Sequence, residues 1–200
     1  TAFETADDPF IRAAVAGYAT DQSREGSARA FAGDLGRASI GWLAAMEAFA
    51  ASEGRTLYPD ANRGLRFTYG HVQGQQLADG VRWTPFTTPQ GLIEKESGKP
   101  PFQSPPELLE KVREANWQEF ASPALGTLPV NFLSDTDITN GNSGSAVLNA
   151  RGELVGLAFD GTLDGMLSDW QFDPNTTRTI SVDMRYVRWL MKNILNAGHL

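Results

Sequence analysis

Hydrophobic residues follow two different patterns along this chain, and the change between them falls near residue 57. The first apolar residues recur at helical spacing: Phe10, Ile11, Ala14, Val15 and Tyr18. They predict a helix that Asp7 or Asp8 can cap, with Pro9 in its first turn. We expect a polar break over residues 21–26 and then a second, alanine-rich helix over about 27–52, for which Gly54 suits the end.

Beyond residue 57 the pattern changes to short extended runs separated by turn residues. Pro59, Asn62 and Gly64 mark the change, and we place a domain boundary there. Strands are expected at three places, over residues 65–72, 75–77 and 81–83. A proline-rich stretch follows, then a short helix over 105–112, a strand at 130–133 and a C-terminal helix over 183–196, where apolar residues return to helical spacing.

Residues 137–145 read Asp-Ile-Thr-Asn-Gly-Asn-Ser-Gly-Ser, the most informative run in the chain. A tight Gly-x-Ser-Gly turn would direct the hydroxyl of Ser143 outward and point the N–H groups of Gly141 and Ser143 at one spot. Two such donors are what the oxyanion of a tetrahedral intermediate requires. Apolar arms over 146–148 and 154–159 predict a hairpin after the loop. In this setting, residues 137–145 are similar to the nucleophile loop of chymotrypsin-type serine peptidases. An ordinary turn is the simpler alternative.

A serine nucleophile needs a positioned base, usually a histidine that a carboxylate orients. The chain has two histidines. His71 falls within an expected strand with too little barrel before it, and His199 is the penultimate residue. We therefore interpret His71 as an ordinary strand residue and expect the triad His and Asp to be absent from this chain.

Composition and charge limit the classes of partner. The net charge of −7 argues against nucleic acid, and no apolar run is long enough to span a membrane. The polar, acidic start is unlike a signal peptide and reads as the start of an internal fragment. With no cysteine, disulfides and thiolate metal sites are excluded. The acidic residues at 164, 169 and 173 lack an EF-hand pattern, so we expect no metal and no cofactor.

Taken together, these segments resemble the exo-acting serine peptidases of the dipeptidyl-peptidase 7 and 11 family. The matching stretches follow one another through most of residues 57–190: 57–62, 65–70, 85–88, 94–95, 129–134, 137–145, 152–161, 168–170 and 178–187. Family members are much longer. Each has a chymotrypsin-type double β-barrel that a helical domain interrupts, with the triad His and Asp in the N-terminal portion.

The resemblance implies an α+β chain in two parts. Residues 1–56 would be the end of the inserted helical domain, and residues 57–200 a mainly antiparallel, six-stranded chymotrypsin-like barrel with a C-terminal helix. The full-length bacterial protein would be periplasmic, secreted or on the cell surface, and a homodimer. Its N-terminal barrel would pack against this part, so an isolated second barrel should expose an apolar patch.

The resemblance also assigns the site residues. Ser143 matches the nucleophile, and Gly141 with Ser143 would form the oxyanion hole. Asp160 matches the acidic residue that binds the free α-amino group of the peptide, an ion pair that rejects blocked N-termini. Gly161 matches the position that separates subtypes. An arginine there selects an acidic residue before the scissile bond, whereas a glycine leaves an apolar pocket for a hydrophobic or aromatic residue.

Our main hypothesis is that the full-length enzyme releases N-terminal dipeptides through an acyl-enzyme on Ser143, while this chain alone is inactive. A second hypothesis is a trypsin-like or stress-type endoprotease. Asp137 lies where trypsin-like enzymes place the acidic residue of the primary pocket, although it could instead bond the backbone of its own loop. A third is a non-catalytic binding or structural module, because the chain has a nucleophile without a base.

Overall fold

The structure is a computed structural model of the chain, and it describes residues 3–55, 57–58, 64–168 and 172–199. The chain divides into two compact units, residues 1–62 and residues 63–200. Among the described residues, no helix is both long enough and apolar enough to cross a bilayer.

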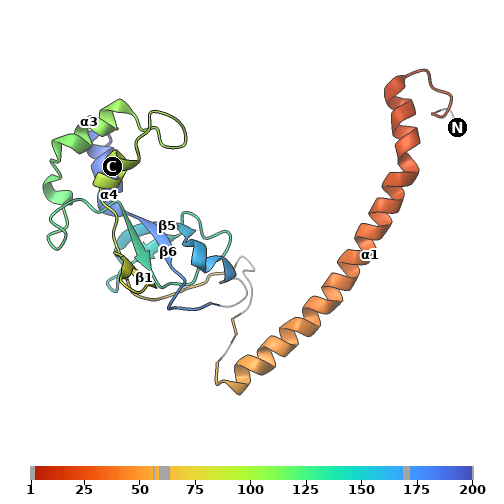
Figure 1. The fold of residues 1–200 in the computed structure, drawn as a ribbon, viewed down its shortest axis with the longest axis horizontal. Coiled ribbons are helices and arrows are strands. Elements are labelled where there is room, and N and C mark those ends of the chain that lie inside the picture. Colours follow the sequence, from red (N-terminus) through yellow and green to blue (C-terminus); the bar gives the residue numbers. More distant parts are fainter. Residues whose placement is uncertain (1–2, 56, 59–63, 169–171, 200) are drawn as a thin grey trace. The chain divides into compact units, whose positions relative to one another are not determined.

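The first unit contains one continuous helix, α1 (Pro9–Ser52) (Figure 1). The Asp8 carboxylate caps it by accepting hydrogen bonds from the N–H groups of Phe10 and Ile11, at 2.8 and 3.2 Å. The helix ends before Gly54, whose φ of +69° stops it as expected. The predicted break at 21–26 is wrong. Polar side chains there are exposed and cost a helix little, and an ion pair between Glu25 and Arg29 supports the following turn.

The second unit is built on a four-stranded antiparallel sheet in the order β3-β6-β5-β4. Its strands, in chain order, are β3 (Asn131–Ser134), β4 (Ala146–Leu148), β5 (Leu154–Gly161) and β6 (Thr179–Asp183). A separate hairpin pairs β1 (Gln75–Ala78) with β2 (Val81–Trp83). The strands predicted near 75–77, 81–83 and 130–133 and the hairpin after the serine loop are therefore confirmed.

The expected six-stranded barrel is not found, because no sheet closes on itself within the described residues. The segment predicted as a strand over 65–72 makes one isolated bridge, from Val72 to Ser134. A second isolated bridge joins Phe86 to Phe132. Both segments follow the free edge of β3 without forming a ladder. Pro85 has no N–H to donate, so it can contribute only its carbonyl, which accepts from Leu133 N–H at 2.8 Å.

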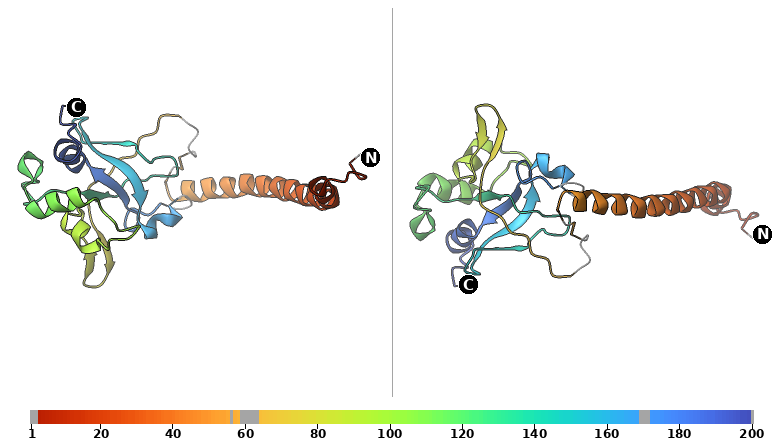
Figure 2. Two further views of the ribbon diagram at one scale, coloured as in Figure 1. Left: turned by 90° about the horizontal axis from the view of Figure 1, so that it is seen from above. Right: turned by 90° about the horizontal axis from the view of Figure 1, so that it is seen from below.

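Helices cover one end of this sheet, where α3 and α4 lie together (Figure 2). They are α2 (Gln90–Lys95), α3 (Pro106–Glu114), the 3₁₀ turn η1 (Gln118–Phe120) and α4 (Met184–Asn193), while a second 3₁₀ turn, η2 (Leu163–Leu167), follows β5. The core cluster comprises Val112, Phe120, Leu128 and Trp189. The predicted short helix and C-terminal helix are confirmed.

Candidate functional site

A pocket of about 420 Å³ lies among the loop after β3, the end of β5 and η2. Its walls come from three separate stretches, within residues 138–143, 159–168 and 177–178. The residues predicted for the site all line it: Gly141, Ser143, Asp160 and Gly161. The fold therefore brings together two motifs that the sequence shows apart.

Ser143 lies on a tight turn that hydrogen bonds within the loop stabilise. Gly141 has φ +98° and Gly144 has φ +84°, backbone conformations that residues with a Cβ rarely adopt. The Asn142 side-chain oxygen accepts from Thr139 N–H at 3.0 Å, and the Asn142 N–H donates to the Thr139 carbonyl at 3.2 Å. Because the loop is held from within, it presents Ser143 as an exposed residue at the pocket.

Two backbone hydrogen bonds join this loop to the strand that carries Asp160. Gly144 N–H donates to the Ala158 carbonyl at 2.7 Å, and Ala158 N–H donates to the Ser145 carbonyl at 3.0 Å. In the described part of the chain, neither the N–H of Gly141 nor that of Ser143 donates to a protein acceptor. Both donors are therefore available to a bound group, as an oxyanion hole requires.

Asp160 and Gly161 lie at the end of β5, where the register with β6 is irregular between Ala158 and Asp160. Irregularities of this kind change the direction of side chains along a strand. The Asp160 carboxylate is exposed and accepts from Gly161 N–H at 2.8 Å. A Cβ built on Gly161 would lie 3.7 Å from the Arg178 carbonyl oxygen, which is an ordinary contact. The backbone thus leaves space for a larger residue at this position.

Arg178 forms part of the pocket wall, a role that the sequence analysis did not identify. The residue is only 4% exposed. Its guanidinium donates to four backbone carbonyls, those of Gly74, Pro174, Asn175 and Thr177, at 2.6–3.3 Å. These bonds connect the segment before β1 with the loop before β6. The only signal in the sequence was its place in the stretch 178–187, and spacing could not show which carbonyls it reaches.

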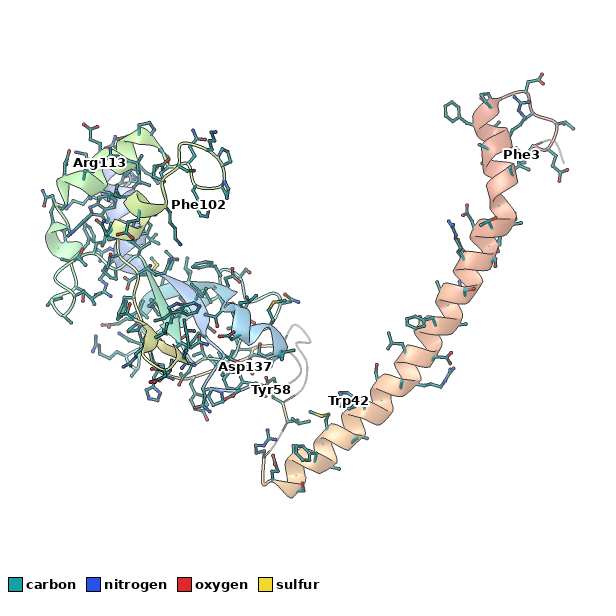
Figure 3. All side chains as sticks on the ribbon, in the orientation of Figure 1. Phe3, Trp42, Tyr58, Phe102, Arg113 and Asp137 are labelled. Atoms are coloured by element: carbon teal, nitrogen blue, oxygen red, sulfur yellow. The ribbon has the colours of Figure 1, made fainter. Side chains whose placement is uncertain are left out.

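The other candidate side chains do not line this pocket among the described residues. His71 is exposed, and its backbone N–H donates to the Asp135 carboxylate at 2.5 Å; His199 is exposed as well. Asp137, which is labelled in Figure 3, is partly buried, and its N–H donates to the Thr68 hydroxyl at 3.0 Å. The described lining therefore contains neither a histidine base nor the acidic residue of a trypsin-like pocket.

Comparison with known proteins relates this site to a peptidase family. The family model "Peptidase S46" matches residues 1–200. The chain is 37% identical over 221 aligned residues to the Asp/Glu-specific dipeptidyl-peptidase of Shewanella putrefaciens, covering 100% of the chain and 30% of that protein. It is 42% identical over 143 residues to dipeptidyl-peptidase 7 of Phocaeicola vulgatus, covering 71% of the chain and 20% of the relative.

Solved structures of dipeptidyl-peptidases also match this chain. The crystal structure of Porphyromonas endodontalis DPP11 in complex with the dipeptide Arg-Glu matches with a TM-score of 0.82 and 33% identity, over 98% of this chain and 28% of that one. The complex with Arg-Asp matches over 72% of this chain and 21% of that one, at 38% identity and a TM-score of 0.68. The chain spans 30% or less of the length of these relatives. It belongs to the peptidase S46 family, as its segments between residues 57 and 190 predicted.

Proposed function

We propose that this chain is the C-terminal part of a serine exopeptidase that releases dipeptides from the free N-termini of peptides. The observation that carries the proposal is that Ser143 and Asp160 line one pocket. A hydroxyl nucleophile and an exposed carboxylate in one cavity can hold a peptide by its terminal ammonium and attack it at a fixed distance from that end.

The chemistry follows from these positions. Ser143 Oγ attacks the carbonyl carbon of the second residue, and the N–H groups of Gly141 and Ser143 stabilise the resulting oxyanion. The serine proton passes through the base to the departing amine, and the peptide bond breaks. Water then hydrolyses the ester on Ser143, which frees the dipeptide and restores the hydroxyl.

The base would come from the N-terminal barrel of the same full-length protein. Three apolar residues at alternate positions are exposed, which supports the proposal that another surface of the full-length protein covers them: Leu65, Phe67 and Tyr69. The chain by itself should therefore be inactive, because a serine without its histidine loses almost all of its nucleophilic catalysis. A periplasmic, secreted or cell-surface location and a homodimer complete the proposal by family resemblance.

The proposed specificity is for a hydrophobic or aromatic residue before the scissile bond. Relatives carry two kinds of name, dipeptidyl-peptidase 7 and Asp/Glu-specific dipeptidyl-peptidase. One relative with the second name aligns with the whole of this chain. Acidic specificity is thus the competing candidate. Two features of this pocket favour the hydrophobic one: Gly161 contributes no cation, and the Arg178 guanidinium is engaged by backbone carbonyls.

The test is hydrolysis of free-amine dipeptidyl fluorogenic substrates with Leu, Phe or Asp in the second position, by the full-length protein and by this chain. We expect the full-length protein to cleave the Leu and Phe substrates, and this chain to be silent. Ser143→Ala should abolish activity, whereas the neighbouring Ser145→Ala should retain it. Cleavage of N-acetylated substrates would instead favour an endoprotease. Absence of any cleavage would favour a non-catalytic module.

A further inference from the structure

The turn η2, which follows β5, has an unusual distribution of polarity. Its large apolar side chains are exposed: Leu163, Met166 and Leu167 are 77%, 73% and 70% exposed. Its polar contacts, in contrast, face the protein. Asp164 accepts a 2.7 Å hydrogen bond from the side-chain amide of Gln75, which is buried. Apolar side chains that gather on one exposed turn are typical of a binding surface.

Hydrogen bonds hold the turn in this orientation. Thr162, which is buried, donates its N–H to the Arg178 carbonyl at 2.9 Å, and the Arg178 N–H donates to the Thr162 hydroxyl at 3.3 Å. Gly165 N–H donates to the Thr162 carbonyl at 2.8 Å. A Cβ on Gly165 would lie 3.3 Å from the Thr177 methyl carbon, which shows how closely the turn approaches residue 177. These hydrogen bonds therefore hold the backbone of η2 in place and keep its apolar side chains exposed.

One of the three apolar side chains faces the candidate site. Met166 lines the pocket together with Ser143 and Gly161, whereas neither Leu163 nor Leu167 is among the described lining residues. We infer that Met166 forms the apolar wall that receives the side chain of the residue before the scissile bond and so determines the preference for a hydrophobic residue there. This inference rests on the proposed function of the site.

Methionine suits such a wall. Its unbranched, polarisable thioether chain adapts to partners of different shape and makes favourable contacts with aromatic rings. Gly161 leaves the space, and Met166 supplies the contact. The wall would accept both aliphatic and aromatic side chains, while an acidic side chain would lose solvation against it without gaining a cation.

The experiment measures kcat/KM of the full-length enzyme and of its Met166→Ala variant on free-amine dipeptidyl substrates with Phe, Leu or Ala in the second position. We expect the preference for Phe over Ala to fall about tenfold, since lost contacts in a hydrophobic pocket change discrimination by factors of this order. Leu167→Ala removes an equally exposed apolar side chain from the same turn and should leave the preference unchanged. Met166→Leu should retain most of it.

Three results would overturn the inference. An unchanged Phe-to-Ala preference in Met166→Ala would place the wall elsewhere, while the activity of the parent enzyme would leave the proposed function intact. An equal loss on all three substrates would show that Met166 supports the loop rather than the substrate side chain. If the parent enzyme releases no dipeptide from any substrate, the proposed function and this inference fail together.

Discussion

The carboxylate of Asp160 accepts a 2.8 Å hydrogen bond from the backbone N–H of Gly161, its neighbour in β5. The bond involves one of the two carboxylate oxygens and orients the group at the pocket. The second oxygen remains for an ammonium group. A charge-assisted hydrogen bond of this kind is about twice as strong as a neutral one, which makes Asp160 a suitable anchor for a free N-terminus.

Asp160→Asn should therefore weaken recognition of the N-terminus without disturbing the strand. The amide oxygen can still accept from Gly161 N–H, but the negative charge is lost. We expect kcat/KM on a free-amine dipeptidyl substrate to fall about 10- to 100-fold, the equivalent of one charged hydrogen bond. Steady-state assays of the full-length enzyme measure this. An N-acetylated analogue serves as control, since neither the parent nor the variant should cleave it. Equal activity of parent and variant would exclude Asp160 as the anchor.

Gly161→Arg should shift the preference toward acidic residues. A side chain at this position meets only an ordinary contact with the Arg178 carbonyl oxygen, at 3.7 Å from the added Cβ. The new guanidinium would bring a cation to a pocket wall where the existing one is engaged by carbonyls. We expect the Glu-to-Leu ratio of kcat/KM to rise by at least about tenfold. Gly161→Gln, long but uncharged, separates charge from size, and a similar rise in that variant would argue against the electrostatic reason.

Features that depend on neighbouring residues could be predicted from the sequence. The serine loop needs glycines at 141 and 144, whose positive φ values are typical of that residue. The hairpin after it and the C-terminal helix α4 follow from equally local patterns. Local sequence also placed Ser143 and Gly141 in one turn, although only the family resemblance connected them with Asp160.

Features that depend on contacts between distant segments could not be predicted in this way. The polar run at 21–26 resembles a loop, yet nothing in it prevents a helix, so α1 continues through it. The barrel was expected from the family, but the edge of β3 gains only isolated bridges. Arg178 and Met166 line the pocket because their segments pack beside the serine loop, and their spacing in the sequence carries no sign of this.

The Phe132 side chain of β3 lies close to Gly156 of β5, and this contact yields a stability prediction. A Cβ on Gly156 would lie 2.6 Å from Phe132 Cε1 and 2.8 Å from the Val182 carbonyl oxygen, both far too close. Gly156→Ala should lower the free energy of unfolding by about 1–3 kcal/mol, as is usual for overpacked cores. Urea unfolding followed by tryptophan fluorescence measures it. Gly91→Ala is the control, because nothing lies within 4 Å of its added Cβ and a helix favours alanine. Equal midpoints for the two variants would contradict this packing.

Glu96 gives a prediction about pH. Its carboxylate accepts hydrogen bonds from the backbone N–H groups of Gly98 and Ser104, both at 2.7 Å, and these bonds lower the pKa of Glu96. A carboxylate whose pKa is lower in the folded state than in the unfolded state stabilises the fold at pH values above its unfolded pKa. That stabilisation is lost as the pH falls through the folded value.

We therefore expect Glu96→Gln to unfold at a lower urea concentration than the parent at pH 7, with the difference shrinking as the pH falls below the usual range of a glutamate pKa. Unfolding midpoints measured from pH 7 down to about pH 3 test this. Glu110→Gln removes an exposed carboxylate from α3 and should follow the parent curve throughout. If the Glu96→Gln difference stayed constant across that range, its cause would be the shape of the amide rather than the charge that the two N–H groups stabilise.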